Sequence, residues 1–153
     1  MISKFVSGSE EEFVKQMNET AHKLGMKNST FNNPSGLDET DGNYSSSYDM
    51  ALLMREALKY EEFRRITSTK KYKLKTNYKT YIWNNKNKLL ANDFIIGGKT
   101  GYTKKAGRTL VSAANIDNNI FIVVTIKDSD DWNSHLSLYD TIRGKYQKYT
   151  LLS

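Results

Sequence analysis

The feature that most constrains this chain is the run IIGGKTGYTKKAGRTLVSAA, residues 95–114. A buried strand normally avoids glycine, because glycine loses much backbone entropy on folding and adds no side chain to the core. Here glycines stand on both sides of Lys99 and Thr100, directly before a strand-like run. We interpret this arrangement as backbone that a ligand approaches closely, beside a cation and a hydroxyl that suit a carboxylate or a phosphate.

The phosphate alternative fails on spacing. A loop of the form G-x-x-x-x-G-K-[ST] needs a glycine at position 93, where this chain has Asp93. Such a loop also runs into the N-terminus of a helix, whereas residues 102–111 have the pattern of a strand. We therefore expect the motif to lie on a strand, where Lys99 and Gly101 share one face and Thr100 takes the other unless the strand bulges.

Helix signals occupy the first half of the chain. Ser9 and Ser46 each stand three residues before an acidic residue, which is the pattern of a capping box. Apolar residues then recur at helical spacing, and Gly25 ends the first helix. Residues 33–43 are dense in turn formers and predict a long surface loop, and residues 63–66 predict a short helical turn.

The pattern of the second half predicts strands and one helix. Residues 71–83 alternate lysine with tyrosine, leucine and tryptophan, which predicts a hairpin with one solvated face. From Ile95 we expect a strand, a glycine-rich break, and strands at 109–114 and 120–126 joined by an Asp-Asn-Asn turn. Residues 131–146 place Trp132, Leu136, Tyr139, Ile142 and Tyr146 on one helical stripe. The fold class is α+β: a helical region followed by antiparallel strands and a C-terminal helix.

Composition excludes several kinds of site. The chain has no cysteine, so it offers no thiol nucleophile and no cysteine metal site. His22 and His135 lie far apart in sequence and outside any metal-ligand spacing, so we interpret them as surface or helix-face histidines. No cofactor and no metal is expected. The first ten residues lack the apolar run of a signal peptide, and residues 120–126 are too short to span a bilayer.

The net charge of +6 is concentrated in residues 63–92, which contain nine cations and no acidic residue. These are Arg64, Arg65, Lys70, Lys71, Lys73, Lys75, Lys79, Lys86 and Lys88. Lysines interleaved with aromatics could bind single-stranded nucleic acid through charge and stacking. We favour a solvated hairpin whose aromatics pack inward, because no nucleic-acid module motif accompanies the lysines. No specific nucleic-acid partner is expected.

The glycine-rich run resembles the third motif region of the serine D-alanyl-D-alanine carboxypeptidases. These are the low-molecular-mass penicillin-binding proteins of the β-lactamase-like superfamily. The upstream stretch from GSEEEF to MREAL is similar to the segment that follows the second motif of these enzymes. The resemblance covers about residues 7–138. It implies a partial β-lactamase/transpeptidase-like fold in one partial catalytic domain, with a helical part at about 9–66, a hairpin and sheet part at about 67–127, and a C-terminal helix at about 131–146.

The resemblance also implies the roles of the motif. Lys99 supplies the cation, Thr100 binds the terminal carboxylate, Gly101 clears space, and the backbone N–H of Tyr102 is one oxyanion-hole donor. The implied substrate is a peptidoglycan stem peptide ending in D-Ala-D-Ala, hydrolysed through an acyl-serine, and the complete domain would bind β-lactams. For the parent protein the resemblance implies an extracytoplasmic place in the cell envelope.

Two motifs of the family are absent. It needs S-x-x-K, whose serine is acylated and whose lysine activates it, and S-x-N on the opposite wall of the cleft. Ser68 and Lys71 match S-x-x-K only formally, because Ser68 leads into a lysine-rich strand, and no S-x-N triplet exists. We therefore expect no catalytic residue in this chain and an inactive C-terminal portion of a catalytic domain. Self-association, or pairing with the missing N-terminal part, should cover its exposed surfaces, with Leu53, Met54 and Leu58 as candidates. The alternative function is a non-catalytic cell-wall or nucleic-acid binding module that uses residues 63–92.

Overall fold

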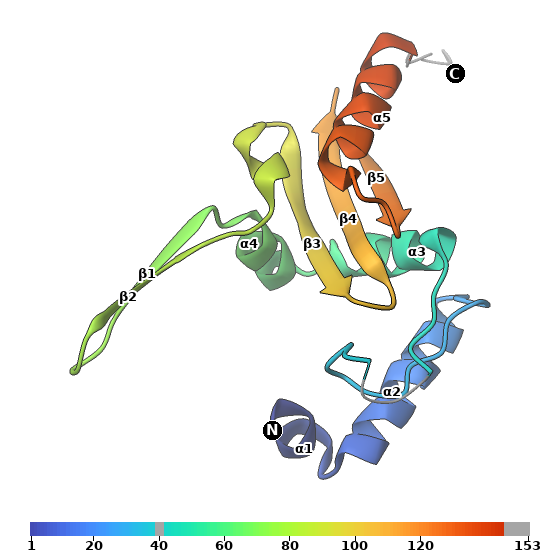
Figure 1. The fold of residues 1–153 in the computed structure, drawn as a ribbon, viewed down its shortest axis with the longest axis vertical. Coiled ribbons are helices and arrows are strands. Elements are labelled where there is room, and N and C mark those ends of the chain that lie inside the picture. Colours follow the sequence, from blue (N-terminus) through green and yellow to red (C-terminus); the bar gives the residue numbers. More distant parts are fainter. Residues whose placement is uncertain (39–41, 146–153) are drawn as a thin grey trace, which may run out of the picture.

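A computed structural model describes residues 1–38 and 42–145 (Figure 1). Its elements in chain order are α1 (Ile2–Ser7), α2 (Glu10–Lys23), α3 (Ser47–Ala57), α4 (Glu61–Ser68), β1 (Lys71–Lys75), β2 (Thr80–Asn84), the 3₁₀ helix η1 (Lys88–Ala91), β3 (Ile95–Thr103), β4 (Gly107–Ile116), β5 (Asn119–Ile126) and α5 (Asp131–Lys145). This mixture of helices and antiparallel strands is the expected α+β class. None of the helices in the described ranges has the length and apolar character needed to cross a lipid bilayer.

The two helices with capping boxes begin where the sequence predicts. The Ser9 side chain accepts a hydrogen bond from the N–H of Glu12 at 3.0 Å, and the Ser46 side chain accepts one from the N–H of Asp49 at 3.1 Å. Gly25 follows α2 with φ of +78°, a conformation that glycine adopts without steric cost. Helix α1 was not predicted, because it is short and carries no capping signal.

Strands β3, β4 and β5 form an antiparallel sheet in that order. The expected turn between the last two strands is present, with positive φ at Asp117 and Asn118, as a two-residue hairpin turn requires. The expected glycine-rich break is wrong. Strand β3 runs continuously through the glycines from Ile95 to Thr103, and only its register shifts between Ile95 and Gly97.

Strand β4 carries the core on both of its faces. Leu110 and Ala114 pack toward α5 and η1, in a cluster that includes Leu89, Leu90 and Tyr139. Val111 and Ala113 pack on the other face in a second cluster, with Met54 and Leu58. We expected Met54 and Leu58 to lie on an uncovered helical face, and this is wrong, since both are buried against the sheet.

The hairpin is present, but its packing differs from the expectation. Strands β1 and β2 pair from Lys71 with Asn84 to Lys75 with Thr80, and they extend away from the rest of the molecule (Figure 1). Tyr72 and Trp83 are each half exposed, so the expected inward packing of the aromatics is wrong. Alternation along a strand needs a partner layer to bury one face, and within the described residues this hairpin has none beyond its base.

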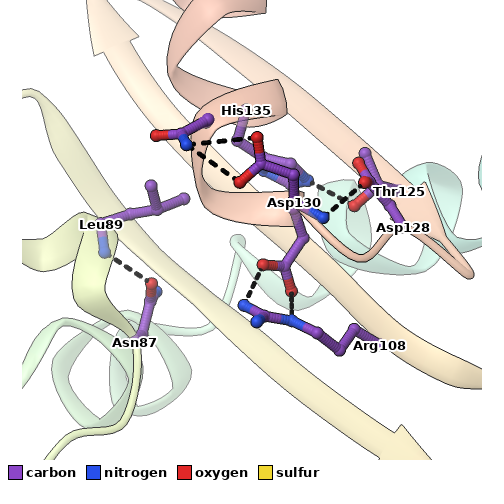
Figure 2. Close-up of polar contacts among 9 residues, drawn as sticks. Asn87, Leu89, Arg108, Thr125, Asp128, Asp130 and His135 are labelled. Carbon is purple, nitrogen blue, oxygen red and sulfur yellow. Dashed lines mark hydrogen bonds and ion pairs between the residues drawn. The ribbon is translucent and has the colours of Figure 1, made fainter.

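A buried polar cluster joins α5 to the sheet. The Ser112 hydroxyl lies 2.7 Å from Nδ1 of His135 and 2.8 Å from the hydroxyl of Tyr139. Nε2 of His135 lies 3.1 Å from the hydroxyl of Thr125 (Figure 2). His135 is therefore on a helix face but fully buried, and only His22 has the surface position that we expected. The predicted stripe of α5 continues through Ile142, while Tyr146 lies outside the described residues.

The burial of His135 predicts a pH-dependent stability. Burial lowers the pKa of His135 from 6.5 to about 4, against the opposing influence of Asp131 and Asp128. The unfolded chain therefore takes up this proton at a higher pH than the folded chain. The contribution of His135 to the free energy of unfolding should be complete above pH 6.5, and the free energy of unfolding should decrease as the pH falls from 6.5 toward 4. The shift corresponds to roughly 3 kcal/mol, measurable from urea midpoints across this range.

His135→Gln should flatten this part of the profile, because the titrating group is gone. His22→Gln, at an exposed position of α2, should leave the profile unchanged. An unchanged pH slope in His135→Gln would assign the effect to other groups.

Candidate functional site

The glycines of β3 allow close contact within the protein itself. A Cβ on Gly97, whose φ is +153°, would lie 2.4 Å from the Thr67 hydroxyl of α4. A Cβ on Gly98 would lie 2.6 Å from the backbone oxygen of Val111. At Gly101 it would lie 2.5 Å from the hydroxyl of Thr109. Part of the glycine pattern that suggested a ligand is therefore explained by the approach of α4 and β4 to this strand.

The motif residues alternate as expected. Lys99 pairs with Val111 and Gly101 with Thr109, whereas Thr100 pairs with Leu110, with no bulge between them. Since Val111 and Leu110 belong to the clusters on opposite faces of the sheet, Lys99 and Thr100 project to opposite sides. In the described part of the chain β3 pairs only with β4, so both side chains border the open edge of the sheet.

This edge lines a wide groove of about 1290 Å³. Residues 99–103 of β3 form one wall, and the turn-rich loop, represented in the described residues by 35–38 and 42–45, lies across from it. The floor includes the apolar side chains Met50, Val111 and Val124. The structure thus brings all four predicted site residues, Lys99 to Tyr102, to one groove.

The charged residues that line the groove differ in whether they form an ion pair. Arg108 donates two hydrogen bonds to the carboxylate of Asp131, which is buried at the start of α5. The ammonium of Lys99 is exposed and donates to the backbone oxygen of Thr100. No carboxylate in residues 1–38 or 42–145 forms an ion pair with Lys99. The groove therefore presents a cation to solvent at the motif.

The sequence did not predict two sets of interactions that support the groove. Asp49 was expected only as a helix-cap partner, but it is buried and accepts hydrogen bonds from the N–H of Asn28 at 2.7 Å and from the Ser29 hydroxyl at 2.8 Å. It thereby fixes the segment before the loop to α3. The ion pair of Arg108 with Asp131 was also missed. The signal in both cases was only a charged residue beside an apolar run, which is common on surfaces.

The formal S-x-x-K match lies elsewhere. Ser68 is exposed at the end of α4, where its hydroxyl donates to the backbone oxygen of Arg65 at 3.3 Å. Lys71 is the first residue of β1, and neither residue lines the groove. Within the described ranges, no group of three or more histidines and acidic residues is arranged to hold a metal ion.

Comparison with known proteins identifies the class. Residues 1–130 match the family described as D-alanyl-D-alanine carboxypeptidase. The D-alanyl-D-alanine carboxypeptidase DacF of Bacillus subtilis is 45% identical over 125 residues, which are 80% of this chain and 32% of that protein. The chain therefore belongs to the D-alanyl-D-alanine carboxypeptidase family, and it spans about a third of the length of this relative.

Solved structures show the same fold. A D-alanyl-D-alanine carboxypeptidase from Mycobacterium tuberculosis superposes with a TM-score of 0.85 at 25% identity, covering 97% of this chain and 59% of that one. The Streptomyces K15 DD-transpeptidase superposes with a TM-score of 0.74 at 28% identity, covering 85% of this chain and 55% of that one. The expected penicillin-binding-protein fold is therefore confirmed for the part of the fold that this chain forms.

The glycine contacts predict different costs of substitution. Gly98→Ala should lower the free energy of unfolding by about 1–3 kcal/mol, because the new methyl group meets the fixed backbone oxygen of Val111 and, at 3.0 Å, Nδ2 of Asn87. Gly101→Ala should cost less, since the Thr109 hydroxyl can rotate away. Urea unfolding measures both.

Adding Thr109→Ala should remove most of the cost of Gly101→Ala and none of the cost of Gly98→Ala. Equal costs at the two glycines would mean that β3 moves as a unit and that these contacts do not determine its position.

Proposed function

We propose that this chain forms the KTG-bearing wall of the substrate cleft in a serine D-Ala-D-Ala carboxypeptidase. The complete enzyme removes the terminal D-alanine from peptidoglycan stem peptides through an acyl-serine, outside the cytoplasm, and binds β-lactams. The observation that carries this proposal is the exposed Lys99 beside Thr100 on the open edge of β3, within a groove. Membership of the carboxypeptidase family supports it.

The geometry suggests how the motif binds a carboxylate. Lys99 and Thr100 project from opposite faces of β3, so they reach a common ligand only at the edge, where the two faces meet. A terminal carboxylate there accepts from the Thr100 hydroxyl and lies in the field of the Lys99 ammonium. A charge-assisted hydrogen bond of this kind contributes roughly 1.5–3 kcal/mol. Gly101 leaves room for the peptide to lie along the edge as an added strand.

The backbone N–H of Tyr102 is proposed to donate to the oxyanion of the tetrahedral intermediate. Such donors act on charge that develops during the reaction, and removing one typically costs about a hundred- to a thousand-fold in rate. Since the donor is a backbone group, its position depends on the pairing of Tyr102 with Arg108, which the ion pair to Asp131 holds at the start of α5.

The nucleophile comes from a separate segment. This chain has no S-x-N triplet, and its one formal S-x-x-K lies outside the groove. At about 1290 Å³ the groove exceeds the roughly 300–1,000 Å³ of ordinary small-molecule pockets, and its floor is partly apolar. We infer that an N-terminal segment carrying S-x-x-K and S-x-N fills part of it.

A labelling experiment tests the proposal. The chain alone should give no covalent adduct with a fluorescent penicillin on a denaturing gel, because no activated serine faces the groove. Mixed with an N-terminal polypeptide that carries S-x-x-K and S-x-N, it should support labelling of that polypeptide. Lys99→Ala should reduce this labelling by at least about tenfold, from the loss of one charge-assisted contact.

Lys104→Ala, in the turn after β3, is the matched control and should label normally. A band on the isolated chain that disappears with Ser68→Ala would contradict the assignment of the nucleophile. Equal losses of labelling and of thermal stability in Lys99→Ala would show that the lysine is structural.

The apolar floor of the groove predicts self-association of the isolated chain. Covering a few hundred Å² of apolar surface contributes several kcal/mol at about 25 cal/mol per Å², before the entropy of association is subtracted. Light scattering coupled to size exclusion should therefore show a dimer or larger species, and the N-terminal polypeptide should convert it to a one-to-one complex. A monomer with a cooperative melt at every concentration would contradict this.

A further inference from the structure

The β1–β2 hairpin has two chemically different faces. The register pairs Tyr72 with Trp83 and Leu74 with Tyr81, which places these four side chains on one face. We call them the aromatic face. Lys71, Lys73 and Lys75 alternate with them and project from the opposite face. The hairpin extends away from the sheet and helices, so both faces are accessible (Figure 1).

The rings of the aromatic face form an ordered array. Trp83 stacks on Tyr72 with ring centroids 6.2 Å apart and planes 8° apart, and on Tyr81 at 5.4 Å and 15°. The ammonium of Lys79 lies 4.5 Å from the centroid of the Tyr81 ring. Such an array is held in place before any ligand arrives, so binding to it costs little side-chain entropy. Trp83 is nevertheless 50% exposed.

A hollow of about 350 Å³ lies at the base of this face. Tyr72 and Trp83 line it together with Arg65, Thr69 and Asn84. The Arg65 guanidinium is held by the Glu62 carboxylate at 2.5 and 3.0 Å. Flat rings beside amide, hydroxyl and guanidinium groups match a sugar, which offers C–H groups on one ring face and hydroxyls around its rim.

The positive charge of the hairpin and its neighbouring residues favours an anionic ligand. Residues 63–92 contain nine cations and no acidic residue. Of these cations, Lys70 pairs with Asp93 at 3.4 Å and Arg65 with Glu62, and the lysines of β1 face solvent. A local excess of positive charge raises the concentration and the association rate of polyanions near this surface.

We propose that the aromatic face binds an amino-sugar polymer, namely the glycan strands to which the stem peptides are attached, while the lysines of the opposite face attract the carboxylates of those peptides. The choice of this polymer rests on the proposed function. A membrane surface fits less well, because the aromatic and cationic side chains point in opposite directions. Single-stranded nucleic acid also fits less well, because the rings already stack on one another and leave no gap for a base between them.

Cosedimentation with purified insoluble peptidoglycan tests the proposal. Trp83→Ala should weaken binding about fivefold, from the loss of the central ring, while Trp83→Tyr should retain most of it. Lys71→Gln with Lys73→Gln should weaken binding at low salt and leave the aromatic face intact. Matched controls are Tyr48→Ala, an exposed tyrosine on α3, and Lys23→Gln with Lys27→Gln. Both controls should bind like the parent chain.

Competitors separate this site from the groove. Peptide-free amino-sugar oligomers should displace the chain, and a free D-Ala-D-Ala peptide should not. Displacement by the peptide alone, or unchanged binding by Trp83→Ala, would overturn the proposal. Equally tight and Trp83-dependent binding to anionic lipid vesicles or to a single-stranded oligonucleotide would overturn it in favour of those partners. Trp83→Ala should leave the penicillin labelling of the mixed polypeptides unchanged, because Trp83 does not line the groove, so failure here is distinguishable from failure of the cleft assignment.

Discussion

The burial of β4 on both faces is the constraint on which the rest of the structure depends. Five consecutive residues, Leu110 to Ala114, are at most 8% exposed. Their side chains alternate between the cluster under α5 and the cluster under α3 and α4, so one strand fixes helices on both sides of the sheet. Strand β3 is positioned through β4, α4 and η1, and its glycines let β4 and α4 approach closely. The groove is therefore a consequence of how tightly this central strand is packed.

Local signals in the sequence were sufficient for most element boundaries. Caps at Ser9 and Ser46, the turn at Asp117 and Asn118, and the hairpin at 71–84 depend on residues within a few positions of one another. Contacts across long separations were not predictable in this way. His135 looks like an ordinary helix residue until Ser112 and Thr125 surround it. Burial of such groups depends on tertiary packing, which periodicity does not encode.

The candidate site also has parts that local sequence signals predict and parts that depend on long-range contacts. The assignment of Lys99, Thr100, Gly101 and Tyr102 to one strand followed from alternation and from family resemblance, and the register agrees with it. The groove opposite them could not be read from the sequence, because its other wall comes from a loop and from α3 far upstream. The exposure of the hairpin aromatics could not be predicted either. Alternation shows that a strand has two faces, but it does not show whether another element covers one of them.

The groups that we propose for the substrate cleft differ in the step at which they act. If Lys99 and Thr100 hold the terminal carboxylate as proposed, they bind substrate and transition state alike, because the carboxylate does not change charge during acyl transfer. Their loss should raise KM more than it lowers kcat. In its proposed role as oxyanion donor, the Tyr102 N–H meets charge that exists only after attack, so a shift of β3 should lower kcat instead. Since β4 sets the position of β3, a packing change at Gly98 should alter kcat in the complete enzyme without touching the substrate. In this view, binding specificity resides in side chains of the exposed edge, and catalytic assistance resides in a backbone that the buried strand holds still.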